Sequence, residues 1–482
     1  MATPIPLWRS ADAVVAMNAT ATGAADWQAH GVSIDTRTLQ PGDMFFALEG
    51  DGADGHDYVA QALKKGAACV VVSRAIADLA DTSSVLMVDN TLRALERLGI
   101  AARARSDARI CAVTGSVGKT GTKEGLRHIL EGQGITHASA ASYNNHIGVP
   151  LTLARMPADA QFGVFEIGMN HANEIAPLTR MVQPEAAIVT TVEAVHIENF
   201  NAVEDIADAK GEIFEGLQAG GTAILNRDNV HFERLKARAG LCGAGNIVGF
   251  GHSELADARI ERMSLRADAS YVTATICGHD ITYKLGVPGE HIVMNSLAML
   301  ACVNALGADL ALAGLALAGL EPPAGRGSRI EIALGGGSFL MIDESYNANP
   351  TSMAAVMQAL GNTPPGPHGR RIAVVGDMLE LGDHARAGHA GLKEPILAAD
   401  VDLVFACGPL MENLWDALPQ RVRGAYADTS AELAPRVVEE IAPGDVVMVK
   451  GSLGSRMAQV VTALKNMGTP VTVTPQEEQE PV

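Results

Sequence analysis

The amino-acid sequence predicts an α/β protein of three domains: a small α/β domain at the N-terminus, a central doubly wound sheet like that of P-loop ATPases, and a Rossmann-like α/β domain at the C-terminus. The chain has 482 residues, too many for one ordinary hydrophobic core. From Arg109 onward, short apolar runs alternate with helix-compatible segments, and a Pro/Gly-rich stretch separates two such series. We expect domains at 1–107, 108–324 and 325–470, followed by a disordered tail at 471–482.

Composition limits the classes of partner and the location. The net charge is −19, which argues against a nucleic-acid partner but leaves anionic small molecules open, because a site can be locally basic. The six cysteines stand singly, so neither a zinc site nor a disulfide framework is indicated. The N-terminus has no secretion-signal pattern, and the apolar segment 291–320 is interrupted by polar residues, which indicates buried helices. We expect a cytoplasmic monomer with no membrane partner.

In the N-terminal domain, short apolar runs are separated by turn residues. Strands are expected at 44–48 and 68–73, with a helix at 58–65 between them. Asp35, Arg37 and His56 fall in the loops, where binding residues concentrate. Solvated turn residues have the same composition, so the pattern alone leaves a binding role and a turn role open.

A Gly-rich turn follows the first strand of the central domain and reads Thr114-Gly-Ser-Val-Gly-Lys119-Thr120. Its backbone N–H groups, with the N-terminus of a helix at 122–130, form an anion site. The lysine would reach terminal phosphates and the threonine hydroxyl would bind Mg²⁺. The standard motif has its first glycine where this chain has Val113, so the loop is a variant. A nucleotide-phosphate site is favoured over a chance turn.

Polar side chains follow the other strands of the central domain. The strand at 162–165 ends in Glu166, where a nucleotide-binding sheet places its second metal contact. The strand at 186–191 leads to His196, at the sheet edge where ligands bind. A lone histidine is more often structural, but this position favours function. Lys210 lies on a helix expected at 203–218, where an ordinary solvated lysine is the alternative.

The C-terminal domain repeats the strand–helix pattern. A strand at 339–342 ends in Asp343, and Pro350 suits the first position of the next helix, with Asn349 as its cap. Further strands are expected at 372–375, 403–407 and 446–449. The sequence therefore indicates a second α/β sheet with polar residues at its strand ends.

Together these residues resemble the ATP-dependent Mur ligases of bacterial cell-wall synthesis. The variant loop, Glu166, His196, Asn295, Arg326 and Asp343 match that family's signature positions in order and across two domains. Four stretches are similar to the branch that adds a dipeptide, and they are residues 143–150, 166–171, 343–350 and 376–382. The Asp-Asn-Pro-Arg motif of the branch that adds a diamino acid or lysine is absent. The departures lie at Gly121, at 192–196 and at 450–456.

The resemblance implies ATP and Mg²⁺ as cofactors, and UDP-N-acetylmuramoyl-tripeptide and D-alanyl-D-alanine as small-molecule substrates joined through an acyl phosphate. It implies catalytic roles for Lys119, His196 and Lys210, and a metal site of Thr120, Glu166 and His196. It implies ATP contacts from Thr114, Gly115, Ser116, Val117, Gly118, Lys119, Thr120, Gly121, Asn295, Arg326, Asp343 and Asn347. It implies substrate contacts from Ser33, Asp35, Arg37, Asn144, Asn145 and Asn349. Whether Lys210 is carbamylated, and whether the tripeptide ends in meso-diaminopimelate or lysine, stays open.

Two other classes of protein share parts of this pattern. A ligase like folylpolyglutamate synthase would share the loop and the acyl phosphate, but the N-terminal domain resembles one that holds a uridine nucleotide. A nucleotide-switch GTPase should carry an Asn-Lys-x-Asp motif to recognise guanine, and the sequence has none. Both are therefore weaker than the Mur ligase prediction.

Overall fold

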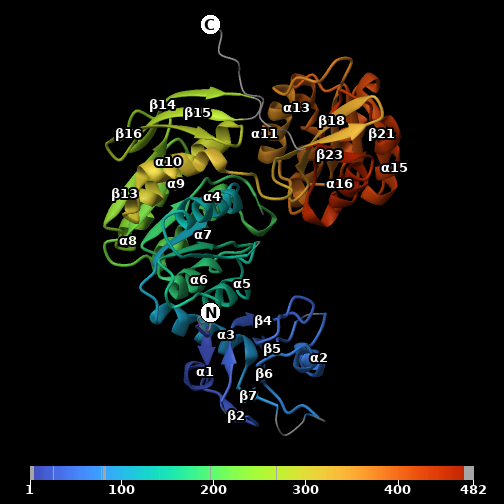
Figure 1. The fold of residues 1–482 in the computed structure, drawn as a ribbon. Helices are drawn as coiled ribbons and strands as arrows, with labels where there is room; N and C mark the ends of the chain where they lie inside the picture. The colour runs from blue at the N-terminus through green and yellow to red at the C-terminus, as the bar shows by residue number, and fades with distance from the viewer. Residues whose placement is uncertain are drawn as a thin grey trace.

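The computed structural model describes residues 5–24, 26–50, 52–77, 79, 83–140, 142–195, 197–266 and 269–471. Three regions, each with its own main sheet, follow one another along the chain (Figure 1). The central region touches both of the others, and the N-terminal region (blue) lies at the end opposite the C-terminal region (orange to red). The predicted α/β class with three such regions is confirmed. Of the tail expected at 471–482, only Val471 is described, and it ends a strand.

The N-terminal region contains a five-stranded sheet in the order β2-β7-β6-β5-β4, parallel except for β2. Its inner strands are short and apolar on both faces, as expected for buried parallel strands. The strands are β1 (Trp8–Arg9), β2 (Thr20–Thr22), β3 (Gln28–Ala29), β4 (Gly31–Ser33), β5 (Asp43–Phe46), β6 (Cys69–Val72) and β7 (Val85–Met87), of which β1 and β3 form a separate pair. The helices are α1 (Ser10–Met17), α2 (Val59–Lys64) and α3 (Thr91–Ala104).

The central region has a nine-stranded sheet in the order β16-β15-β14-β13-β12-β11-β8-β10-β9. Strands β8 to β14 run parallel, and a meander of β14, β15 and β16 that the sequence did not predict extends one edge. The strands are β8 (Arg109–Thr114), β9 (Thr136–Ala138), β10 (Phe162–Glu166), β11 (Ala186–Val189), β12 (Thr222–Asn226), β13 (Asn246–Gly251), β14 (Ala258–Leu265), β15 (Ser270–Ile276) and β16 (His279–Leu285).

Helices cover both faces of the central sheet, which makes it doubly wound as predicted. One face packs against α4 (Lys119–Glu131), α9 (Glu290–Ala305) and α10 (Leu310–Ala316), and the other against α5 (Gly148–Ala154), α6 (Ile175–Val182), α7 (Val203–Gly211) and α8 (Phe232–Leu241). The apolar segment 291–320 thus forms buried helices rather than a membrane span. Among the described helices, none combines the length and apolar character that crossing a bilayer requires.

The C-terminal region has a seven-stranded sheet in the order β21-β20-β19-β22-β18-β17-β23. The strands are β17 (Ser328–Leu334), β18 (Gly337–Glu344), β19 (Arg371–Gly376), β20 (Leu403–Cys407), β21 (Arg423–Ala427), β22 (Val446–Lys450) and β23 (Thr469–Val471). The helices are α11 (Pro350–Gly361), α12 (Ala385–Ala390), α13 (Lys393–Ala398), α14 (Glu412–Ala417), α15 (Ser430–Glu440) and α16 (Ala458–Lys465). Helix α11 begins as predicted, because Asn349 Oδ1 accepts a hydrogen bond from Ser352 N at 2.8 Å.

The N-terminal and central regions share helix α5. Leu151 and Ala154 belong to the N-terminal core, whereas Val149 and Leu153 belong to the central core. Trp8 Nε1 donates a hydrogen bond to the Ala154 carbonyl at 2.8 Å. Helix α5 therefore fastens the N-terminal region to the sheet that carries the phosphate loop.

Candidate active site

The phosphate loop lies at the carboxyl end of β8, between two parallel neighbours, β10 and β11. Two of its glycines have no room for a side chain. A Cβ on Gly115 would lie 1.9 Å from Thr190 Oγ1, and a Cβ on Gly118 would lie 2.8 Å from Asn295 Nδ2. Gly118 also has a φ of +84°, which favours glycine. The loop is thus held between the segment after β11 and helix α9.

Lys119 is the first residue of α4, and its side chain lies along the loop. Its Nζ donates a hydrogen bond to the Gly115 carbonyl at 2.6 Å. Burial lowers the pKa of the Lys119 ammonium, the Glu166 carboxylate raises it, and the Arg326 guanidinium lowers it again. The charges of Lys119, Arg326 and Glu166 therefore interact at the mouth of the loop.

Glu166 ends strand β10 and is almost completely buried. Its Oε2 accepts a hydrogen bond from Thr120 Oγ1 at 2.8 Å, and its Oε1 accepts one from Asn144 Nδ2 at 2.7 Å. A carboxylate and a hydroxyl side by side are the oxygen donors that Mg²⁺ prefers. The structure thus brings together two of the three predicted metal ligands, while His196 lies outside the described residues.

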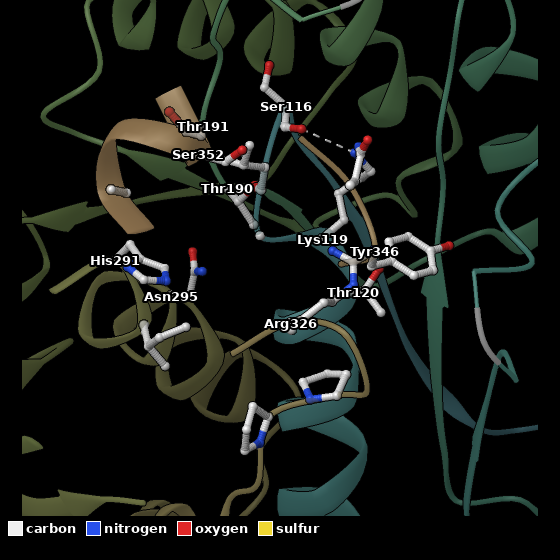
Figure 2. A pocket seen from close by; sticks show the side chains of 18 of the residues that line it. Ser116, Lys119, Thr120, Thr190, Thr191, His291, Asn295, Arg326, Tyr346 and Ser352 are labelled. Carbon is white, nitrogen blue, oxygen red and sulfur yellow. Dashed lines mark hydrogen bonds between the residues drawn. The ribbon is translucent and has the colours of Figure 1, made fainter. Parts of the chain in front are cut away.

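A cleft of about 510 Å³ lies between the central and C-terminal regions. Figure 2 shows Lys119, Thr120, Arg326 and Tyr346 close together on one side of the cleft, with His291 and Asn295 on the other. Twelve predicted site residues line it, and they are Ser116, Val117, Gly118, Lys119, Thr120, Gly121, Asn144, Glu166, Asn295, Arg326, Asn347 and Asn349.

Other predicted site residues do not line this cleft. Asp343 is buried, and its Oδ1 accepts hydrogen bonds from the backbone N and the hydroxyl of Ser345. Asn145 caps helix α5 by accepting hydrogen bonds from the backbone of residues 147 and 148. The remaining ones lie at the start of the loop, on helix α7 or in the N-terminal region, and they are Thr114, Gly115, Lys210, Ser33, Asp35 and Arg37.

Lys210 lies buried on α7. Burial lowers the pKa of this ammonium group well below its usual value, and the nearby charge of Lys119 lowers it further. The structure therefore excludes the alternative of a solvated helix lysine.

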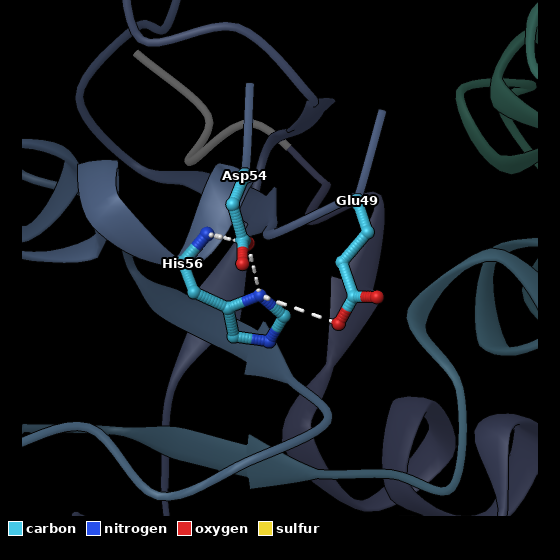
Figure 3. A group of neighbouring side chains, drawn as sticks. All are labelled: Glu49, Asp54 and His56. Carbon is cyan, nitrogen blue, oxygen red and sulfur yellow. Dashed lines mark hydrogen bonds and ion pairs between the residues drawn. The ribbon is translucent and has the colours of Figure 1, made fainter. Parts of the chain in front are cut away.

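His56 belongs to a second polar cluster, in the N-terminal region, with Glu49 and Asp54 (Figure 3). Its Nδ1 lies 2.6 Å from Asp54 Oδ1, and its Nε2 accepts a hydrogen bond from Ser73 N at 3.0 Å. Hydrogen bonds from His56, and one from Arg74, lower the pKa of the Asp54 carboxyl. Because both ring nitrogens have protein partners, this cluster fastens the loop after β5 to the end of β6.

The structure adds cleft residues that were not among the predicted site residues. Lys450 ends β22 and donates hydrogen bonds to the Asn347 carbonyl at 2.9 Å and to Glu344 Oε2 at 3.3 Å. Tyr346 lies under the Arg326 guanidinium, 4.1 Å from its carbon to the ring centre. The available signal was their place at the carboxyl ends of strands β18 and β22.

We expect Arg326→Met to weaken ATP binding and to slow turnover, because this cation lies in the linker, lines the cleft and stacks on Tyr346 of the C-terminal region. The loss of a charged contact predicts about a tenfold weaker affinity for ATP, measured by calorimetry. Tyr346→Leu removes the stack but keeps the charge and should have the smaller effect. Equal ATP affinity and turnover in Arg326→Met and the unmodified protein would remove Arg326 from the site.

Family comparisons agree with this arrangement, region by region. Residues 28–104 match the profile described as "Mur ligase family, catalytic domain", residues 113–303 match "Mur ligase middle domain", and residues 328–453 match "Mur ligase, glutamate ligase domain". The chain belongs to the Mur ligase family.

Several relatives that are 29–36% identical to this chain carry one name. The chain is 36% identical to the UDP-N-acetylmuramoyl-tripeptide--D-alanyl-D-alanine ligase of Escherichia coli, over 92% of this chain and 96% of that protein. It is 33% identical to the Bacillus subtilis ligase of the same name, over 90% and 93%. A MurF crystal structure from Acinetobacter baumannii matches with a TM-score of 0.82 at 28% identity, over 96% of this chain and 99% of that one. MurF from Thermotoga maritima in complex with ADP shares the fold, with a TM-score of 0.75 at 24% identity, over 91% and 97%.

Proposed function

We propose that this protein joins D-alanyl-D-alanine to UDP-N-acetylmuramoyl-tripeptide at the expense of ATP, as a step of peptidoglycan precursor synthesis. The single observation that carries the proposal is the cleft itself. One wall is a phosphate loop with Lys119 and Glu166, and the facing wall comes from a different region of the chain. Such a cleft can hold a nucleotide together with a second reactant. The named activity of relatives that match nine-tenths of the chain supplies the substrates.

The reaction has two steps. The terminal carboxylate of the tripeptide attacks the γ-phosphorus of ATP, and ADP leaves, which gives an acyl phosphate. The amine of D-alanyl-D-alanine then attacks the acyl carbon, and phosphate leaves from the tetrahedral intermediate. The first step brings a carboxylate to a polyphosphate, so its transition state needs positive charge nearby.

The side chains of the cleft suit this task. Lys119 and Arg326 are cations at the mouth of the loop, and their charges interact. Asn144 and Thr120 hold the Glu166 carboxylate in one orientation. We assign Lys119 and Arg326 to the phosphates and Asn295 and Asn347 to the adenosine part. We assign Asn349 and Asn144 to the substrates. Asp343 is buried and hydrogen-bonded to Ser345, so it can contact the ribose only if it gives up its hydrogen bonds to Ser345.

Thr120 and Glu166 would hold Mg²⁺, and His196 completes the proposed set. The fit is good, because the hydroxyl and carboxylate oxygens lie 2.8 Å apart in a buried position and are donors of the right type. When bound, the ion would neutralise phosphate charge.

The three segments 1–107, 108–324 and 325–470 are proposed to divide the work. The N-terminal segment, with Ser33, Asp35 and Arg37, holds the UDP end of the substrate. The central segment binds ATP, and the C-terminal segment completes the cleft on the side where the dipeptide enters. Helix α5 supports this division, because it connects the N-terminal sheet with the loop that carries Asn144.

We propose that Lys210 is carbamylated. A carbamate forms when a neutral amine attacks CO₂ and releases a proton, and burial favours the neutral amine. The side chain of Lys210 is buried, and the new carboxylate would face the charge of Lys119. Carbamylation would thus replace a buried amine with an anion beside a cation.

Removing CO₂ should therefore lower activity, and bicarbonate should restore it. After equilibration with ¹³CO₂, the unmodified protein should give a carbamate carbon signal in its NMR spectrum, and Lys210→Met should not. Lys236, an exposed lysine of α8, provides the matched variant Lys236→Met, in which the signal should persist. A protein indifferent to CO₂ and without the signal would contradict carbamylation.

The proposed function is tested by following phosphate release. The protein is incubated with ATP, Mg²⁺ and UDP-N-acetylmuramoyl-tripeptide, with and without D-alanyl-D-alanine. We expect sustained release only with the dipeptide, together with a product that carries both substrates. Release that ignores the dipeptide would refute the assignment, and release that depends on a folate instead of the UDP substrate would favour the folylpolyglutamate class.

A further inference from the structure

Residues 376–382, which follow β19, form a firmly anchored turn in the C-terminal region. The Asp377 carboxylate accepts a hydrogen bond from Met411 N at 2.8 Å. Met378 N donates to the buried His389 Nε2 at 2.9 Å, and Leu379 N donates to Ser452 Oγ at 3.0 Å. Three neighbouring segments thus hold residues 377–379, and Gly382 follows them in the same turn.

Gly382 touches the central region. A Cβ built on it would lie 3.0 Å from Glu198 Cβ and 3.4 Å from Glu198 Cα. The φ of Gly382 is +51°, in the left-handed region. Glycine is therefore favoured twice, by the backbone conformation and by the close approach of the facing chain. Glu198 lies in the short 3₁₀ helix Ile197–Asn199, two residues after His196 in the sequence.

The segment that leads from β11 to Glu198 is bonded to the phosphate loop. Ser116 N donates to the Thr191 carbonyl at 2.9 Å. Ser116 Oγ donates to the Glu193 carbonyl at 3.0 Å and accepts from Glu193 N at 2.8 Å. Thr190 Oγ1 donates to the Val117 carbonyl at 2.6 Å. A displacement of Glu198 can therefore reach the loop that would cradle the phosphates, through one short stretch of chain.

We propose that Gly382 is a positioning residue for the reaction. Its contact with Glu198 sets the segment 190–195, and through it the phosphate loop, in the arrangement that supports transfer. The position of the C-terminal region thereby affects the phosphate loop through a contact that lies outside the cleft. This inference rests on the proposed function, because it assumes that the two regions must be together for the dipeptide to react.

The test uses a charge placed at the contact. Aspartate and asparagine both tolerate a left-handed backbone, so Gly382→Asp and Gly382→Asn differ mainly in charge. Next to Glu198, the aspartate introduces like-charge repulsion. We expect Gly382→Asp to lower kcat about tenfold, an effect within the range of coupling between two sites. The kcat of Gly382→Asn should lie between those of the unmodified protein and of Gly382→Asp. The KM for ATP should hardly change, because Gly382 does not line the cleft.

Two further variants make the result specific. Glu198→Lys in the Gly382→Asp background should recover most of the lost kcat, whereas Glu198→Ala should recover less, because only lysine supplies an opposite charge. Rising ionic strength should reduce the difference in kcat between Gly382→Asp and Gly382→Asn, because salt screens the repulsion.

Gly278→Asp is the control. Gly278 also has a positive φ, and a Cβ there meets nothing within 4 Å. The kcat of Gly278→Asp should therefore match that of the unmodified protein.

The outcomes separate the two proposals. If the unmodified protein does not ligate the dipeptide, the proposed function is wrong. If it ligates but Gly382→Asp turns over like Gly278→Asp, or if Glu198→Lys brings no recovery, the positioning role is wrong. Thermal unfolding of each variant distinguishes a lost contact from a lost fold. If Gly382→Asp unfolds, the test uses the double variant Gly382→Asn, Glu198→Gly. It removes the facing Cβ and its charge, so its kcat should exceed that of Gly382→Asn alone, and an equal kcat would contradict the positioning role.

Discussion

Lys119→Met should lower kcat for ligation about a hundred- to a thousandfold, the usual cost of removing one preorganised charge-stabilising donor. Lys119 is the cation of the phosphate loop itself, and its charge interacts with those of Glu166 and Arg326. Without it, the carboxylate of the tripeptide approaches the γ-phosphate with less compensation. The KM for ATP should rise much less, because backbone N–H groups and Arg326 still bind the nucleotide.

The measurement is steady-state ligation at saturating substrates, with ATP binding determined separately by calorimetry. Lys236→Met is the matched control, because it removes an exposed lysine of α8 that does not line the cleft. Turnover of Lys119→Met within a fewfold of the control would show that this ammonium group does not act on the transferred phosphate.

Glu166→Gln should have a comparable effect, a loss of kcat on the order of a hundredfold, because it keeps the shape but removes the charge of a buried carboxylate. The glutamine can still bond to Thr120 and fill the same space, so the fold should be retained. A neutral amide is a poorer ligand for Mg²⁺ than a carboxylate. The dependence of the rate on Mg²⁺ should therefore shift to higher concentrations.

A titration of the ligation rate with Mg²⁺ checks this expectation. Glu233→Gln, at an exposed position of α8, provides the control and should leave the titration unchanged. An unaltered Mg²⁺ dependence in Glu166→Gln would remove Glu166 from the proposed metal site, whatever the effect on kcat.

Motifs carried by a short stretch of chain could be predicted from the sequence. The loop at 114–120, the strand that ends in Glu166 and the capped start of α11 all depend on local residue types, and the structure has them where expected. The alternation of strands and helices likewise predicted the doubly wound central sheet and a second α/β sheet after it. The β14–β16 meander was missed, because its strands of seven or eight residues lie at the sheet edge and carry no phosphate-binding or strand-end signal.

Contacts between distant segments were harder to foresee. Nothing near Lys450 in the sequence says that its ammonium group meets Glu344 and the Asn347 carbonyl, because these lie more than a hundred residues away. The residues around Lys210 left an ordinary solvated lysine open as an alternative, and only the packing shows that its side chain is buried. The same holds for Gly382, whose role depends on the approach of Glu198 from another region.

The central claim is that a carboxylate, rather than water, attacks the γ-phosphate held near Lys119. It is tested most directly with UDP-N-acetylmuramoyl-tripeptide labelled with ¹⁸O in its terminal carboxylate. The attacking oxygen becomes the bridge of the acyl phosphate and leaves with phosphorus when the amine attacks. Mass spectrometry should therefore find one ¹⁸O atom in each phosphate released during ligation. Phosphate that contains no ¹⁸O from the substrate would contradict the claim.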